Sequence, residues 1–297
     1  MPTRAPLRYP DHLAARYRAQ ILRRQAQVWG LVNAQVGAVL HVRGADINAR
    51  ADSAEEDLAA ILRVIAVVER VVGEEMPPDR GALRGMGEQL DLFARRQVDD
   101  RVKRLARVSI LPGSPSRDYL LDQWVDRNVS LITSIDQQFF GQLREKARTA
   151  VLSGRSTRDL REELQSRYGV SKSRADLIAR DQVGKLNGQI TQQRHADLGI
   201  EEYIWRTSRD ERVRGNPAGL YPDARHSHYA LEGRRFKVRG PGAPGIGHPG
   251  DDFQCRCTQE PVLPWDTEES LQAYDRQAAA AERQRASLSL IGGRLGA

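Results

Sequence analysis

Apolar positions in the first half of the chain recur at the spacing of α-helices, every third or fourth residue. This spacing predicts helices over residues 11–42, 53–73, 81–107 and 118–153, separated by breaks rich in proline and glycine. The apolar positions of the second helix are Leu58, Ile61, Leu62, Ile65, Val68 and Val72. One side of each helix is therefore expected to face a common core.

Residues 154–199 are predicted to form two shorter helices. Gly169 is expected to end the first, Ser173 and Asp176 have the spacing of a capping box for the second, and Gly199 is expected to end it. Such a pair is also the outline of a helix-turn-helix DNA reader, although most short helix pairs only pack together.

The pattern changes after Gly199. Residues 201–214 alternate between apolar and polar side chains, which predicts a strand leading into a turn, and "LEGRRFKV" predicts a second strand. The stretch "GPGAPGIGHPG" holds too much glycine and proline for regular structure. We expect an α+β fold, mainly α-helical over the N-terminal two-thirds, with a small, loop-rich, β-containing C-terminal module.

The same boundaries predict four parts of the chain. Residues 1–110 are a helical N-terminal region, and 111–200 hold a long helix followed by the short helix pair. Residues 201–265 form the compact C-terminal module, and 266–297 form a polar helical or flexible tail.

Charge adds a candidate contact surface in the middle of the chain. The net charge of the 297 residues is +7, and the excess lies in residues 101–200, with 18 basic and 11 acidic side chains, most of the basic ones arginine. Arginine pairs well with phosphates and carboxylates, so this part is expected to face DNA or an acidic protein surface; the alternative is an ordinary solvated helix surface. The candidate contacts are Arg144, Arg148, Arg155, Arg158, Arg174 and Arg180.

The apolar stretches are too short or too interrupted to span a membrane, and the N-terminus lacks the apolar core of a signal peptide. We therefore expect a chain that folds in a cytoplasm, where disulfides are rare.

Both cysteines stand in one short stretch, "HPGDDFQCRC". Residues two apart on an extended strand point to the same side, whereas a disulfide between them would be strained. With nearby histidines, the two thiols predict one tetrahedral zinc site that would stabilise a module poor in large apolar residues. The alternative is that the cysteines are small buried apolar residues and the histidines form hydrogen bonds in loops. The candidate ligands are Cys255, Cys257, His228, His248 and His226.

No motif for phosphate binding or metalloprotease activity is present, nor the nucleophile elbow of hydrolases. We expect that the protein is not an enzyme. The alternatives are a Cys nucleophile assisted by His and Asp, or a zinc-dependent nuclease, and both need an open cleft.

The order of residues in the C-terminal half resembles the phage Mu F-like head morphogenesis family, the minor capsid or minor head proteins. The resemblance is carried by "SKSRADLIARDQVGKLN", "GIEEYIWRTSRDERVR", "HYALEG" and "HPGDDFQCRC", in this order. Within it we expect Trp205 to anchor the core and Asp210, Arg212 and Arg214 to form a local set of ion pairs or hydrogen bonds. The matching positions are Ala179, Arg180, Trp205, Thr207, Asp210, Val213, Arg214, His228, Leu231, Gly233, His248, Pro249, Cys255, Arg256 and Cys257.

The resemblance implies a structural role in a bacteriophage. Such a protein would bind the portal protein, and the major capsid or scaffold protein, while the procapsid assembles in the host cytoplasm. The helices of residues 1–110 would supply the docking surfaces. The protein would then stay in the virion, inside the capsid near the portal vertex, in contact with packaged DNA or leaving with it. Two alternatives are a non-specific dsDNA-binding internal head protein and an enzyme delivered with the genome.

Overall fold

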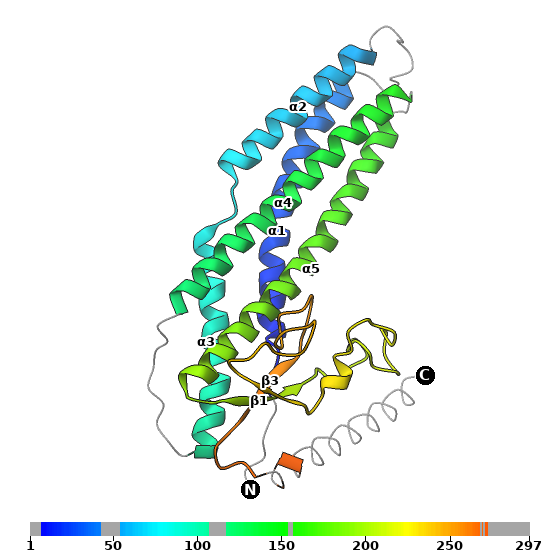
Figure 1. Ribbon diagram of the computed structural model, residues 1–297. Helices are drawn as coiled ribbons and strands as arrows, with labels where there is room; N and C mark the ends of the chain where they lie inside the picture. The colour runs from blue at the N-terminus through cyan, green and yellow to red at the C-terminus, as the bar shows by residue number, and fades with distance from the viewer. Residues whose placement is uncertain are drawn as a thin grey trace, which may run out of the picture. The chain divides into compact units, whose positions relative to one another are not determined.

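A computed structural model describes residues 7–42, 54–106, 117–153, 157–267, 269, 271 and 272. Most of the predicted tail from residue 266 lies outside these residues. Within the described part, long helices are followed by a small antiparallel sheet, which confirms the expected α+β class (Figure 1). None of the described helices combines the length and apolarity needed to cross a membrane.

The helices lie close to where the apolar spacing predicts them, with one exception. The named strands and the 3-10 helix follow α5 in the sequence. The helices are α1 (Asp11–Val42), α2 (Ala54–Glu75), α3 (Arg80–Ala106), α4 (Arg117–Leu152) and α5 (Thr157–Asp197). The later elements are β1 (Glu202–Arg206), the 3-10 helix η3 (Tyr229–Leu231), β2 (Arg235–Lys237) and β3 (Thr258–Val262).

The exception is α5, which is one continuous helix, so the predicted pair of short helices is wrong. Gly169 is exposed within it, and the hydroxyl of Ser173 donates back to the Gly169 carbonyl at 3.4 Å instead of capping a new helix. Tyr168 stacks on Trp29 with ring centroids 5.1 Å apart, and Ala175 is buried. Packing on both sides of the glycine outweighs its helix penalty of about 1 kcal/mol. Because α5 has no turn at this position, these residues do not form a helix-turn-helix.

The chain folds into two compact units, and neither unit is continuous in the sequence. We call Pro10–Leu92 with Ser116–Leu186 the helical unit. We call Met1–Tyr9, Phe93–Pro115 and Asn187–Ala297 the sheet unit. Helices α3 and α5 each supply residues to both.

The core of the helical unit is built from the predicted apolar stripes of α1, α2 and α4, which run alongside one another (Figure 1). Ile65 of α2 and Val32 of α1 are fully buried, and Phe140 of α4 is 1% exposed. Polar contacts reinforce this packing: Arg24 pairs with the buried carboxylate of Asp136 at 2.7 Å.

The sheet has the strand order β2-β1-β3, and both pairings are antiparallel. The central strand β1 is the one predicted from the alternation after Gly199. Tyr203 lies opposite Phe236 of β2 and Pro261 of β3. Pro261 is tolerated because β3 is an edge strand. Trp205 of β1 is fully buried in the core of the sheet unit, as expected.

Candidate metal centre

Three side chains from two loops meet beside the sheet. His228 stands immediately before η3. Cys257 stands immediately before β3, and Cys255 stands two residues earlier. A turn closed by the Cys255 amide donating to the Asp252 carbonyl at 3.1 Å brings the cysteines into place, and Gln254 takes a positive φ of 52° within it. All three side chains are buried, with His228 only 3% exposed.

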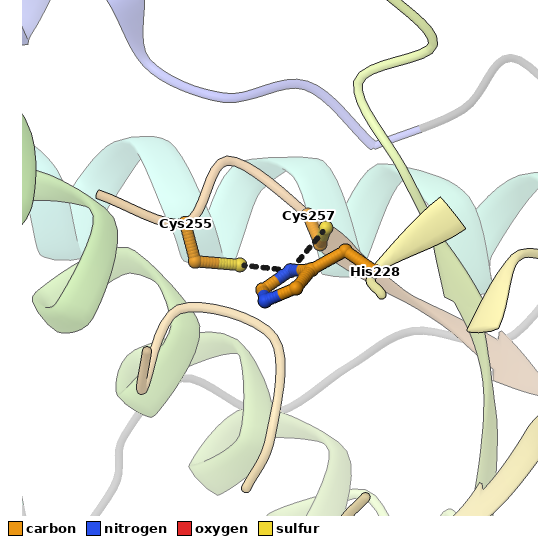
Figure 2. A group of neighbouring side chains, drawn as sticks. All are labelled: His228, Cys255 and Cys257. Carbon is orange, nitrogen blue, oxygen red and sulfur yellow. Dashed lines mark hydrogen bonds between the residues drawn. The ribbon is translucent and has the colours of Figure 1, made fainter. Parts of the chain in front are cut away.

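The imidazole of His228 points its Nδ1 atom at both sulfurs (Figure 2). Nδ1 lies 3.6 Å from Sγ of Cys255 and 3.5 Å from Sγ of Cys257. The three potential ligand atoms all lie within 4.8 Å of one another. Among the described residues, no other group of three or more Cys, His, Asp or Glu side chains converges in this way.

A carboxylate fixes the orientation of the imidazole. Nε2 of His228 lies 2.9 Å from Oδ2 of Asp252, and a guanidinium nitrogen of Arg214 lies 2.8 Å from the same oxygen. Because a carboxylate is an acceptor, Nε2 carries the hydrogen of the neutral ring and Nδ1 keeps its lone pair for the sulfurs.

The local charges favour ionised forms of this group. Burial lowers the pKa of His228, but hydrogen bonds to Cys255 and Asp252 outweigh it and raise the pKa overall. Burial raises the pKa of Asp252, but the hydrogen bond from His228 and the Arg214 charge bring it below its usual value.

The two thiols differ in their tendency to ionise. A hydrogen bond from Cys257, helped by His228 and opposed by burial, holds the pKa of Cys255 well below its usual value. The same hydrogen bond, together with burial, raises the pKa of Cys257. Cys255 is therefore the more readily ionised of the two thiols.

The other two predicted ligands lie elsewhere. Nδ1 of His248 is hydrogen-bonded to the Tyr203 hydroxyl at 2.8 Å, and Nε2 is hydrogen-bonded to the Gly240 carbonyl at 2.8 Å. Both ring nitrogens therefore stabilise the loop. His226 is half-buried and does not belong to the cluster. The structure therefore brings together three of the five candidates.

Asp252 is a member of this site that the sequence reasoning missed. It stands inside the quoted stretch "HPGDDFQCRC", three residues before Cys255. A signal was present, because a histidine ligand commonly needs a carboxylate or carbonyl for its second nitrogen.

The residues around the site form two further polar sets. Asp210 accepts the Arg212 amide at 3.1 Å and pairs with the Arg256 guanidinium, whereas Arg214 pairs with Asp252 instead of Asp210. The local set expected from Asp210, Arg212 and Arg214 is thus divided between two carboxylates.

Glu232 is the second residue that the sequence reasoning missed. Its carboxylate accepts the Thr207 amide at 2.6 Å and the Thr207 hydroxyl at 2.7 Å, and Arg209 pairs with it at 2.8 Å. The next residue, Gly233, takes a positive φ of 77° and donates its amide to the Trp205 carbonyl at 2.9 Å. Leu231 on the other side is buried in the core.

Of the candidate contact arginines, some pair with neighbouring side chains and others are exposed. Arg144 pairs with Glu69, and Arg174 donates to Ser134 at 2.9 Å and to Gln138. Arg148 and Arg180 are exposed. Arg155 and the side chain of Arg158 lie outside the described part of the chain.

Comparison with known proteins finds a family model that matches the region containing these loops. The family model described as "Phage Mu protein F like protein" matches residues 141–260. This part of the chain is similar to the phage Mu F-like family. The Mu F-like region begins within α4, continues through α5 and ends in β3, so it contains His228, Asp252 and both cysteines. The resemblance expected from the motif order is confirmed.

A protein of Haemophilus influenzae described as uncharacterized is 36% identical to this chain over 153 residues. The matched part is 52% of this chain and 32% of that protein, so the chain spans about a third of the relative's length. No solved structure matches the chain.

Proposed function

We propose that this chain is a bacteriophage minor head protein that acts in head morphogenesis and stays in the virion. It would bind the portal protein and the major capsid or scaffold protein on the inner side of the procapsid. The observation that carries the proposal is the Mu F-like match over residues 141–260, in which the helical and loop motifs keep the family's order. A role without catalysis is part of the proposal.

The surface of the helical unit favours a protein partner over DNA. Several of its arginines already pair with acidic side chains, as Arg84 does with Asp118 at 2.6 Å and Arg117 with Asp91 at 2.7 Å. Arg144 is likewise paired with Glu69. Proteins bind duplex DNA through cationic side chains that replace the counterions of the phosphates. An arginine that is paired with a carboxylate replaces these counterions less well. We therefore expect duplex DNA to bind weakly.

An enzymatic role has one observation in its favour. Cys255, His228 and Asp252 lie in the order of a nucleophile, a base and an orienting carboxylate. A nucleophile must reach its substrate, however, and Cys255 is only 4% exposed. Peptidase or nicking activity that disappears in Cys255→Ala, with the fold intact, would favour this alternative.

The proposal is tested in particles and with purified components. Mass spectrometry of purified virions and procapsids should detect the chain in both, in fewer copies than the major capsid protein. Co-expression with the portal protein of the same phage should give a complex on gel filtration, and co-expression with the major capsid protein provides the matched comparison.

Deletion of the gene separates assembly from a bystander role. We expect a large loss of infectious particles with normal production of the major capsid protein. Normal yields of infectious virions from the deletion strain, or virions that never contain the chain, would contradict the proposal. Strong DNA binding that weakens steeply with salt would instead support the DNA-binding alternative.

A further inference from the structure

We propose that Nδ1 of His228 and the sulfurs of Cys255 and Cys257 bind one zinc ion that stabilises the sheet unit. This inference goes beyond the role in head assembly and does not depend on it. It rests on the separations between the three atoms, on the groups that orient them and on their burial.

The two nitrogen–sulfur separations match an edge of a zinc tetrahedron. With Zn–N of about 2.0–2.1 Å and Zn–S of about 2.3 Å, the nitrogen and each sulfur of a tetrahedral site stand about 3.6 Å apart. Nδ1 of His228 lies 3.6 Å from one sulfur and 3.5 Å from the other. Each sulfur therefore lies at the separation from Nδ1 that two ligands of one tetrahedral zinc ion take.

The two distances are nearly equal, as expected for two ligands of one metal ion. Nδ1 has one lone pair, or one hydrogen when the ring is protonated, so it can make one well-directed hydrogen bond to a sulfur. A shared metal ion holds both sulfurs at the same distance, as observed.

The second layer of the site has the form that histidine ligands require. Asp252 accepts from Nε2 of His228 at 2.9 Å, and Arg214 holds Asp252 from the other side at 2.8 Å. This carboxylate–histidine pairing fixes the ring with Nδ1 facing the metal position and increases the basicity of the ligand.

Burial indicates a stabilising ion over a catalytic one. His228 is 3% exposed, Cys255 is 4% exposed and Cys257 is 8% exposed, so solvent and substrates have little access to these ligands. Thiolates and an imidazole are the ligand types that zinc prefers. The ion would connect the loop before η3 to the strand β3, which no regular hydrogen-bond ladder joins directly.

The test is the zinc content of the full-length chain, purified under reducing conditions. We expect about one zinc per chain in the wild type and a near-complete loss in Cys255→Ser, Cys257→Ser and His228→Asn. The matched control is His226→Asn, which removes a nearby loop histidine outside the cluster and should keep the metal. Retention of zinc in all three ligand variants would overturn the assignment.

A second measurement avoids variants that fail to fold. Wild-type protein stripped by a chelator and given Co²⁺ should develop the near-ultraviolet absorption of thiolate-to-cobalt charge transfer, and Zn²⁺ should remove it. Asp252→Asn keeps all three ligands and should weaken zinc binding about 10- to 100-fold. Folded, reduced wild-type protein that binds neither ion would overturn the proposal, and the cluster would then be a hydrogen-bonded packing group.

Discussion

The helical unit and the sheet unit are held together by different kinds of contact. In the helical unit, buried aliphatic and aromatic side chains of α1, α2 and α4 form one continuous core, with ion pairs at its edges. In the sheet unit, short strands and long loops enclose many polar groups. Glu260 and His195 are fully buried there, and Arg101 forms an ion pair with Glu260.

The difference lies in how specific the contacts must be. An apolar stripe tolerates many exchanges of similar volume, because its contribution depends mainly on the area removed from water. A buried carboxylate or imidazole stabilises a fold only when its partners are present in the right geometry. The sheet unit should therefore respond to single substitutions and to solution conditions more sharply than the helical unit.

The largest effect is expected from Trp205→Ala in the sheet unit. Trp205 is fully buried and lies against Phe236, with ring centroids 5.8 Å apart. Removing the indole should lower the free energy of unfolding by about 3–5 kcal/mol, measured by urea denaturation. The control is Trp265→Ala: this side chain is 50% exposed, and its loss should change stability by less than about 0.5 kcal/mol. Equal effects of the two substitutions would contradict the assignment of Trp205, and not Trp265, to the core.

A core substitution in the helical unit sharpens the comparison. Ile65 is fully buried and Val67, two residues along the same helix, is 50% exposed. Ile65→Ala should cost about 2–5 kcal/mol in unfolding free energy, while Val67→Ala should be nearly neutral. Neither substitution should alter zinc content. Loss of zinc in Ile65→Ala would show that the helical core and the metal centre are coupled.

Acid should destabilise the sheet unit through His195. Burial lowers the pKa of His195 to about 3, and neither ring nitrogen has a hydrogen-bond partner among the described residues. The folded state therefore keeps the ring neutral where the unfolded chain takes up a proton. Above about pH 6.5 the ring is neutral in both states, and His195 does not lower the free energy of unfolding. As the pH falls toward 3, proton uptake by the unfolded chain alone lowers that free energy by about a few kcal/mol in total. Urea denaturation between pH 7 and 4 measures it.

The variant His195→Leu isolates this effect. It removes the titrating group while keeping an apolar side chain of similar size, so the fall in stability with acid should become shallower. An unchanged slope would assign the acid sensitivity to other groups.

The smallest effects come from two glycines of α5. Gly169 is exposed, and a Cβ there would meet nothing within 4 Å, so Gly169→Ala should stabilise the protein by up to about 1 kcal/mol. A Cβ on Gly188 would lie 2.2 Å from the Pro249 carbonyl oxygen, so Gly188→Ala should instead destabilise it by about 1–3 kcal/mol. Thermal unfolding of the two variants checks both signs. Stabilisation by Gly188→Ala would contradict the close packing of the loop on α5.

The sequence predicted much of the helical unit because the information there is local. The spacing of residues such as Ile61, Ile65 and Val68 identifies a buried helix face without any knowledge of its partners. The break predicted at Gly169 was wrong because the stacking of Tyr168 on Trp29 comes from a distant part of the chain. A local helix penalty cannot reveal such a contact.

Less of the candidate site could be predicted. The sequence identified His228, Cys255 and Cys257, but it did not distinguish them from His226 and His248. The difference is set by long-range contacts, such as the bond of His248 to Tyr203. Asp252 and Glu232 were missed because a single acidic residue in a loop has no pattern that marks it as buried.

The most direct test follows hydrogen exchange of backbone amides in wild-type protein before and after the metal is removed by a chelator. We predict that protection falls in β1, in β3 and in the loops that carry His228 and the cysteines, while α1, α2 and the first part of α4 keep theirs. Readdition of zinc should restore it. Unchanged protection throughout the sheet unit, in protein shown to have lost its metal, would contradict a stabilising metal centre.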